Sequence, residues 1–210
     1  MKQNLKIKVC GMKATANREA VEKLQVDFLG FIFYPESKRY VGKESDPGLF
    51  NTNKNKVAVF VDENIFEIMG LAKNLGFGYI QLHGKENPGT CRILKKQKLK
   101  IIKAFNLHES FDFSTLKPYK NNIDYFLFDT RSEMPGGSGK KFNWAWLEKY
   151  SGDIPFFLSG GIQPDDAEKI KELDHPMLFG IDLNSGFEVE PGIKNDIKLE
   201  KFIEQIKINR

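Results

Sequence analysis

The sequence predicts an α/β protein built as a single (β/α)₈ TIM barrel, and two observations carry this prediction. Eight short apolar runs rich in Val, Ile or Phe follow one another along the 210 residues, and helical patterns separate most of them. Runs of this length and composition are typical of parallel strands that are buried on both faces. Strands that alternate with helices form a parallel sheet, and eight of them can close into a barrel without a free edge.

The expected strands are given by the apolar runs in chain order. They are Leu5–Gly11, Phe28–Tyr34, Lys56–Val61, Tyr79–Gly84, Lys100–Phe105, Tyr125–Thr130, Pro155–Gly161 and Leu178–Leu183. The alternative arrangement is an open, doubly wound sheet. No GxGxxG motif follows the first run, where such a sheet often carries its nucleotide-binding turn, so the closed barrel is preferred.

Helical patterns are clearest in three segments. Glu63–Gly76 carries apolar residues at helical spacing and stops at a glycine, a common residue just beyond a helix C-terminus. The sequence PDD at 164–166 opens a helix with an acidic first turn, and Asn195–Ile208 supplies the last one. In Lys43–Lys56, a Pro-Gly pair and a run of Asn and Lys leave room only for a short or malformed helix. No linker-like stretch interrupts residues 1–210, which are expected to form one domain.

Composition and charge restrict the class of protein. Hydrophobic residues make up 40% of the chain and charged residues 29%, an ordinary balance for a globular protein. The net charge of +4 would attract an anionic substrate, although the basic residues are spread along the chain. The densest group, the lysines at 95, 96, 98 and 100, suits a solvated helix C-terminus. No basic motif with interleaved aromatic residues supports a nucleic-acid partner.

The chain shows no targeting signal. Its first residues lack the apolar segment of a secretory signal, and no run is long enough to cross a membrane. Cys10 and Cys91 lack the spacing of a disulfide framework or a metal site. We therefore expect a cytoplasmic protein that has no membrane partner and binds no metal.

Candidate site residues are found where the expected strands end, because the active sites of TIM barrels lie at the C-terminal ends of the strands. Two glycine-bearing turns follow the seventh and eighth strands. They contain Gly160 and Gly161, and Asn184 and Ser185. Backbone amides in such turns can bind a phosphate, and the serine adds a hydroxyl donor. We favour phosphate binding over a purely structural role for these glycines.

Two residues with acid–base chemistry end the first and sixth strands. Cys10 follows Val9, and taken alone such a cysteine is more often a small buried hydrophobe than a catalyst. As a base it would need its thiolate form, which a nearby cation or phosphate-binding turn could favour. Asp129 follows three apolar residues, where a carboxylate is costly to bury unless it is paired or functional.

Three further residues are candidates for substrate binding. Arg39 lies in the loop after the second strand, and its guanidinium is suited to gripping a planar carboxylate, although a surface role is the commoner one. His83 ends the fourth strand and could carry a proton or hold a structural hydrogen bond. Asp182 lies in the apolar eighth strand, where hydrogen bonding inside the barrel is the alternative role.

The segment Gly136–Lys141 is rich in glycine but does not match the nucleotide-binding P-loop. Its lysine at 140 is followed by another lysine and Phe142 rather than by Ser or Thr, so the GxxxxGK[ST] spacing is missing. The segment follows the sixth strand. We interpret it as a flexible loop that could close over a substrate.

Taken together, the motifs resemble one family. VCGM, GFIFYPESKRYV, VAVFVDE, IQLHG, FLFDT, GGSGKKFNW, LSGGIQPDDA and IDLNSGFEVEPGIKN occur in this order between about Lys6 and Phe202. This series is similar to the phosphoribosylanthranilate isomerases of tryptophan biosynthesis. The resemblance implies an Amadori rearrangement of an aminoaldose to an aminoketose, on a small phosphosugar substrate, by a monomer or homodimer.

The resemblance also implies roles for individual residues. Asp129 would be the general acid, Cys10 the general base, and Arg39 the residue that holds the anthranilate carboxylate. Phosphate would bind at both turns. In this chain Asn184 stands where the family often has a serine, which puts that side-chain contact in doubt but leaves the backbone amides. The iminium formed from the substrate is its own electron sink, so the reaction needs no metal or cofactor.

At neutral pH this mechanism needs a protonated Asp129 and an ionised Cys10, the reverse of their usual states. Desolvation would have to raise the pKa of the acid, and local positive potential would have to lower that of the thiol.

Three rival functions remain. The histidine-pathway isomerase performs an analogous rearrangement, but it would be expected to use an aspartate where this chain has Cys10. A non-catalytic barrel could keep the phosphate turns, although a pure binder needs neither Cys10 nor Asp129. A nucleic-acid binder depends on net charge alone.

Overall fold

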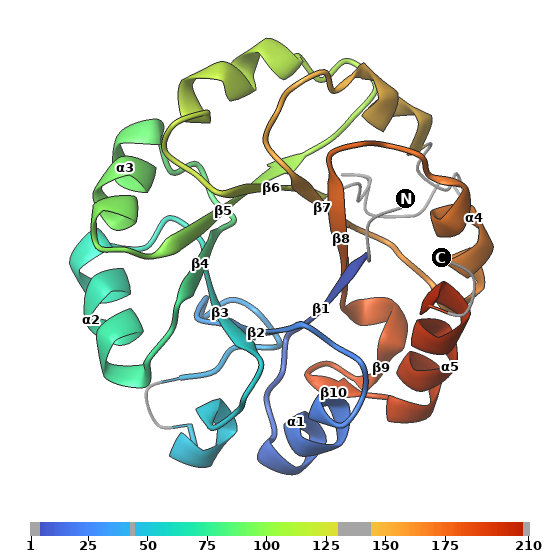
Figure 1. The fold of residues 1–210 in the computed structure, drawn as a ribbon. Helices are drawn as coiled ribbons and strands as arrows, with labels where there is room; N and C mark the ends of the chain where they lie inside the picture. The colour runs from blue at the N-terminus through green and yellow to red at the C-terminus, as the bar shows by residue number, and fades with distance from the viewer. Residues whose placement is uncertain (1–4, 43–44, 130–143, 208–210) are drawn as a thin grey trace.

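The computed structural model describes residues 5–42, 45–129 and 144–207. Eight parallel strands pair in chain order, and β8 pairs back onto β1, so the sheet closes on itself. Figure 1 looks into this ring of strands, with the helices arranged around its outside. The predicted fold class, a (β/α)₈ barrel, is confirmed.

Each strand overlaps the apolar run that predicted it. The strands are β1 Lys6–Cys10, β2 Phe28–Ile32, β3 Asn55–Phe60, β4 Tyr79–Leu82, β5 Lys100–Asn106, β6 Tyr125–Asp129, β7 Phe156–Ser159 and β8 Leu178–Leu183. Because all neighbouring pairs are parallel, the C-terminal ends of the strands meet at one end of the barrel. Residues far apart in the sequence are thereby brought to a common mouth.

Five α-helices lie in the described part of the chain. They are α1 Thr15–Glu22, α2 Ile65–Leu75, α3 Pro88–Lys96, α4 Ala167–Glu172 and α5 Asp196–Lys207. The helix expected over Glu63–Gly76 is confirmed: the Asn64 side chain accepts a hydrogen bond from the amide of Phe66 at the start, and Gly76 ends it with φ of 67°. None of these helices combines the length and the apolar character that a membrane crossing requires.

Short 3₁₀ helices replace several outer helices. The connection after β2, expected to hold only a short helix, contains Pro47–Phe50, where the Asp46 side chain accepts a hydrogen bond from the amide of Gly48. The connections after β5 and β6 contain Phe113–Tyr119 and Trp144–Lys149. The PDD sequence at 164–166 forms a 3₁₀ turn directly before α4.

A two-stranded hairpin after β8 was not expected. It consists of β9 Glu188–Glu190 and β10 Ile193–Lys194, which pair in antiparallel fashion. The side chain of Asn17 in α1 anchors it, because its amide nitrogen donates to the Lys194 carbonyl and its oxygen accepts from the Lys194 amide, both at 2.8 Å. The hairpin therefore lies beside α1 (Figure 1). It carries Glu188 and Lys194, whose side chains contact Arg39 and Asn184.

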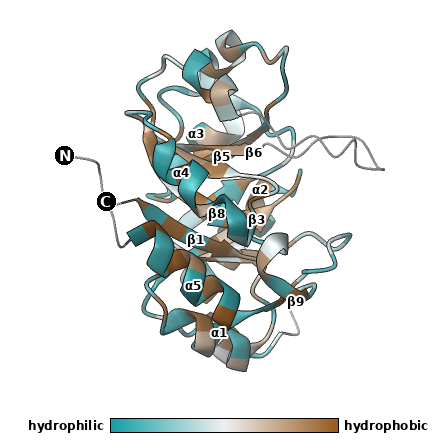
Figure 2. Ribbon diagram, turned by 90° about the vertical axis from the view of Figure 1, so that its right-hand side faces the viewer, coloured by the Kyte–Doolittle hydropathy of each residue, from teal (hydrophilic) through white to brown (hydrophobic). Residues whose placement is uncertain are grey.

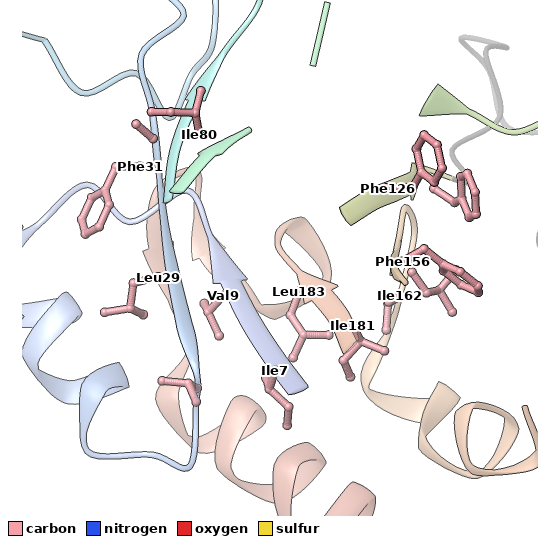
Figure 3. Packing of buried hydrophobic residues seen from close by; sticks show 14 of the residues in the cluster. Ile7, Val9, Leu29, Phe31, Ile80, Phe126, Phe156, Ile162, Ile181 and Leu183 are labelled. Atoms are coloured by element: carbon pink, nitrogen blue, oxygen red, sulfur yellow. The ribbon is translucent and has the colours of Figure 1, made fainter. Parts of the chain in front are cut away.

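Alternation along the strands divides the core into two layers. Ile7 and Val9 of β1, and Ile181 and Leu183 of β8, belong to the large outer cluster and lie near one another in Figure 3. The intervening residues point into the barrel. A smaller inner cluster fills it with Cys10, Phe28, Val57, Val59, Ile102, Ala104, Leu127 and Phe157. In Figure 2 the strands are largely hydrophobic, whereas the outer helices carry both polar and apolar residues.

Candidate active site

A cavity of about 590 Å³, counted to its open mouth, lies at the C-terminal ends of the strands. It is lined by Cys10, Ile32, Arg39, Val59, Gln81, His83, Asp129, Ser159, Gly160, Gly161, Ile162, Asn184 and Ser185. The structure thus brings together all but one of the predicted site residues. The exception is Asp182, which is buried on β8 and does not line the cavity.

The Cys10 thiol is held between β1 and β2. Cys10 is the last residue of β1, is 3% exposed and pairs in register with Gly30. A Cβ atom added at Gly30 would lie 2.7 Å from the Cys10 Sγ and 3.1 Å from its Cα. Real Cβ contacts do not become this short, so the sulfur occupies space that only a glycine leaves free. The absence of a side chain at residue 30 therefore sets the position of the thiol.

Burial raises the pKa of the Cys10 thiol above its ordinary value. The Lys8 and Lys194 ammonium groups act in the opposite direction, and the Asp182 carboxylate adds to the rise. The positive potential expected near the thiol is therefore present, from two lysines, but burial outweighs it. Burial and the Asp182 carboxylate thus favour the protonated form of the thiol.

Lys8 and Asp182 form an ion pair inside the barrel. The Lys8 Nζ lies 2.8 Å from the Asp182 Oδ1, and the two side chains are 0% and 5% exposed. They come from paired strands, where Lys8 is in register with Asp182. The predicted contact of Asp182 with substrate stays a prediction, while its partner within the chain is a buried lysine.

Asp129 faces His83 across the mouth. The His83 Nε2 lies 3.6 Å from the Asp129 Oδ2, and the two side chains are 30% and 16% exposed. On its other side the ring is held by Gln81, whose Nε2 lies 2.9 Å from the His83 Nδ1. If the Gln81 amide donates this bond, the Nδ1 is the acceptor and the ring proton is on the Nε2 that faces Asp129. With that assignment, His83 presents an N–H group toward the Asp129 carboxylate.

Arg39 is engaged by an acidic residue that the sequence did not single out. Its Nε and Nη2 donate to the two carboxylate oxygens of Glu188 at 2.8 and 2.5 Å. This is the two-bond grip expected between Arg39 and a substrate carboxylate, here made within the chain. The ion pair holds the pKa of the Arg39 guanidinium above its ordinary value. Arg39 is thereby fixed at the cavity wall.

Glu188 is the centre of a larger network. The Lys194 Nζ donates to the Glu188 Oε1 and to the Asn184 Oδ1, both at 2.7 Å. Hydrogen bonds from Arg39 and Lys194 outweigh burial and lower the pKa of Glu188 to about 2. Burial lowers the pKa of Lys194. The Asn184 side chain, whose contact with phosphate was in doubt, thus has a partner within the chain, Lys194.

The two glycine-bearing turns lie side by side on the cavity wall. Gly160 and Gly161 have φ angles of 89° and 65°, in the left-handed region that favours glycine. Ser185 begins a short 3₁₀ helix, Ser185–Phe187, directly after Asn184. Such turns can direct successive amides toward an anion. The arrangement fits the predicted phosphate site.

Four polar residues of the site were missed by the sequence reasoning. Lys8 and Gln81 lie two residues before Cys10 and His83 on the same inward faces, so strand alternation could have found them. Glu188 and Lys194 reach the mouth through the hairpin, which no local pattern indicated. The glycine-rich segment Gly136–Lys141 lies outside the described residues.

The described residues contain no group of three or more His, Cys, Asp or Glu side chains arranged to hold a metal ion.

Comparison with known proteins gives a consistent result. Residues 7–205 match the sequence profile of the family described as N-(5'phosphoribosyl)anthranilate (PRA) isomerase. An N-(5'-phosphoribosyl)anthranilate isomerase of Parabacteroides distasonis is 46% identical over 204 residues, which cover 95% of this chain and 92% of that protein.

Solved structures agree with the sequence comparison. The phosphoribosyl anthranilate isomerase of Thermotoga maritima is 29% identical, with a TM-score of 0.85 over 97% of this chain and 98% of the other. A phosphoribosyl anthranilate isomerase crystallised with reduced 1-(o-carboxyphenylamino)-1-deoxyribulose 5-phosphate is 26% identical, with a TM-score of 0.83 over 97% and 98% of the two chains. The profile match spans nearly the whole chain, and the chain belongs to the N-(5'-phosphoribosyl)anthranilate isomerase family.

Proposed function

We propose that this protein converts N-(5-phosphoribosyl)anthranilate to 1-(2-carboxyphenylamino)-1-deoxyribulose 5-phosphate, an aldose–ketose isomerisation in tryptophan biosynthesis. One observation carries the proposal: a thiol from β1 and a carboxyl from β6 line the same cavity, whose wall also holds two glycine-bearing turns. An acid and a base on different sides of a phosphosugar are what an Amadori rearrangement requires.

Asp129 is the proposed general acid. In its protonated form it donates to the furanose ring oxygen, and the C1–O bond opens to give an iminium at the anthranilate nitrogen. The His83 Nε2, 3.6 Å from the Asp129 Oδ2, faces the carboxylate left after this transfer. A donor at this position stabilises the negative charge as it develops.

Cys10 is the proposed general base. The iminium acidifies the proton on the neighbouring sugar carbon, the thiolate removes it, and the C–H electron pair moves toward nitrogen to give an enolamine. The enolamine then tautomerises to the ketone. Acid and base transfers of this kind each contribute about 10²–10⁴-fold to the rate, and fixed orientation adds more.

The substrate is proposed to lie between Arg39 and the two turns. The turn amides at Gly160, Gly161 and Ser185 take the phosphate, and Arg39 takes the anthranilate carboxylate. Because Glu188 already occupies two Arg39 donors, we assign the contact to the remaining nitrogen, Nη1. Binding the two ends of the substrate positions the ribose between Cys10 and Asp129.

The partner of this site is a small phosphosugar, and we propose no nucleic-acid partner. We also propose that the enzyme works in the cytoplasm, where reducing conditions keep the Cys10 thiol free. Its assembly is proposed to be a monomer or a homodimer. One related structure from Thermotoga maritima, 26% identical, is described as a monomer generated from a dimeric isomerase.

The test is a direct assay of the purified protein. Freshly made phosphoribosylanthranilate is fluorescent, and its loss of fluorescence on addition of the protein, with no added metal, is the expected result. The aminoaldose substrate of the histidine-pathway isomerase is the second arm of the assay. Turnover of that substrate alone would overturn the proposal in favour of the rival function.

A further inference from the structure

The inner layer of the barrel contains an ion pair immediately next to the proposed base. Lys8 and Cys10 lie two residues apart on β1 and both point inward, since Ile7 and Val9 belong to the outer cluster. The Lys8 ammonium contacts the Asp182 carboxylate at 2.8 Å, and both groups are removed from solvent. Its positive charge also acts on the Cys10 thiol and opposes the effect of burial on that group. The Lys8 ammonium therefore interacts with two acidic groups, the Asp182 carboxylate and the Cys10 thiol.

This ion pair is not needed to fill the barrel. Elsewhere the inner layer consists of residues such as Val57, Ile102 and Leu127. Replacing a buried ion pair by apolar side chains of similar volume is often neutral or stabilising. A lysine and an aspartate kept beside the only thiol that lines the cavity therefore point to an electrostatic role toward that thiol.

The charges of the three groups allow only some combinations at low cost. With Lys8 protonated, Asp182 ionised and Cys10 neutral, the cluster has no net charge. Ionising Cys10 as well would leave one uncompensated negative charge in the barrel, which is strongly unfavourable. If the proton released by Cys10 is taken up by Asp182, the cluster again has no net charge.

We propose that Lys8, Cys10 and Asp182 share one negative charge, which the Lys8 ammonium holds either on the Asp182 carboxylate or on the Cys10 thiolate. To form the base, the S–H bond breaks and leaves its electron pair on sulfur, while the proton forms an O–H bond at Asp182. Lys8 stays protonated throughout. This inference rests on the proposed function for its purpose, because it explains how a buried thiol becomes a base.

Other charged groups face the cluster and stay in place in the test. Lys194 of β10 and Arg39 of the loop after β2 act on Cys10. His83, directly after β4, and Asp129 of β6 act on Asp182. Lys194 is itself neutralised by Glu188 at 2.7 Å. Of the two lysines, Lys8 opposes the burial of the Cys10 thiol more strongly, and we therefore assign it the main effect.

The test is the pH dependence of Cys10 alkylation by iodoacetamide. It is carried out in a Cys91→Ala background, which leaves Cys10 as the only cysteine. Asp182→Asn removes the competing carboxylate, so Lys8 favours the thiolate and the midpoint of the alkylation profile should fall. Lys8→Met removes the cation, so the midpoint should rise. We expect shifts of about one pH unit or more, equivalent to about a tenfold change in the thiolate fraction below the midpoint.

The matched control is Lys103→Met in the same background. Lys103 also forms a buried ion pair, with Glu86 at 3.1 Å and side-chain exposures of 2% and 3%. It lies on β5 and is not one of the charged groups named above as acting on Cys10. Its removal should leave the Cys10 midpoint unchanged. An equal shift in this variant would mean that any broken ion pair perturbs the thiol, and the proposal would be overturned.

Lys8→Met leaves a buried carboxylate unpaired and can fail to fold. The double variant Lys8→Met/Asp182→Asn leaves no unpaired charge in the barrel. It is used in place of Lys8→Met if that single variant does not fold. Its midpoint should lie above that of Asp182→Asn alone. Equal midpoints in these two variants, or shifts in the same direction in the two single variants, would contradict charge sharing. Alkylation does not depend on turnover, so a failure of the isomerase assay and a failure of this proposal are separate results.

Discussion

Glu188 of β9 holds the Arg39 guanidinium through both carboxylate oxygens, at 2.8 Å from Nε and 2.5 Å from Nη2. The two residues are 149 positions apart in the chain, and both side chains are largely buried. Lys194 holds the same carboxylate from the next strand, at 2.7 Å. The orientation of Arg39, the proposed carboxylate-binding residue, therefore depends on the β9–β10 hairpin, which lies far from it in the sequence.

Glu188→Gln is expected to weaken substrate binding. A hydrogen bond to a charged group contributes about 1.5–3 kcal/mol, so its loss should raise KM about tenfold or more. kcat should change less, since residue 188 does not touch the reacting atoms. Steady-state kinetics give both constants. Glu190→Gln, an exposed position on the same strand, is the control and should have wild-type kinetics.

A substrate analogue without the anthranilate carboxylate separates two explanations of that result. If Glu188 acts by orienting Arg39, the analogue should bind the wild type and Glu188→Gln about equally well. An equally large loss of affinity for the analogue would show that Glu188 acts through something other than the carboxylate contact.

Cys10→Ser and Asp129→Asn are expected to lower kcat by about 10²–10⁴-fold each with little change in KM, because each removes one positioned proton transfer. Cys91→Ala serves as the control. Cys91 is also buried, but it lies on α3 and does not line the cavity, so this variant should lose stability and keep its kcat. Wild-type turnover in either site variant would refute the assigned role.

Gly30→Ala is expected to displace the thiol. The added Cβ would lie 2.7 Å from the Cys10 Sγ, so sulfur or strand must move. Misplacement by about 1 Å can cost on the order of 10²-fold in rate. We expect kcat to fall by this order while circular dichroism shows an intact fold.

Gly70→Ala tests the same change where space is available. No heavy atom lies within 4 Å of the added Cβ in the exposed middle of α2. This variant should be more stable by about 0.5–1 kcal/mol, because alanine favours the helix, and its kcat should not change. A similar fall of kcat in both variants would show that Gly30 has no special relation to Cys10.

The sequence was sufficient for the barrel and for most of the site because both depend on local patterns. A buried parallel strand is a short apolar run, and its C-terminal residue lies at the mouth whatever the helices do. Cys10, His83 and Asp129 were found in this way. The 3₁₀ helices after β5 and β6 did not alter this, since the strands they connect still pair in order.

The rest depended on contacts between distant residues. The hairpin that carries Glu188 and Lys194 is anchored by Asn17 of α1, and nothing near residue 188 predicts that contact. Whether the pKa of Cys10 is raised or lowered likewise depends on two opposing effects, the burial of the thiol and the positive charge of Lys8. A sequence shows which charges are present but not the balance between their effects and desolvation.

Gln81 and His83 are expected to act as one unit. Gln81→Leu removes the partner that fixes the His83 ring, and His83→Ala removes the donor facing Asp129. If Gln81 acts only through His83, the double variant should be no slower than His83→Ala. A double-mutant cycle on kcat/KM measures this coupling. Fully additive losses would mean that Gln81 has an independent role, for instance through its buried Oε1, which has no hydrogen-bond partner in the described structure.

Glu188 is also expected to make stability depend on pH in acid. Its pKa is about 2 in the folded protein against an ordinary 4.5, so folding favours the ionised form. The resulting stabilisation is fully present above pH 4.5 and is lost as pH falls toward 2, because the unfolded chain then binds the proton more readily. It amounts to at most about 3 kcal/mol, less what solvent screening removes.

Urea unfolding of the wild type and Glu188→Gln at a series of pH values measures this contribution. The glutamine variant should be less stable near neutral pH, and the difference should shrink as pH falls from 4.5 toward 2. Other carboxylates titrate in both proteins and cancel in the difference. A difference that stays constant over this range would show that Glu188 stabilises the fold through packing alone, since packing does not respond to the proton, and the charge of the Arg39 pair would then contribute nothing measurable to stability.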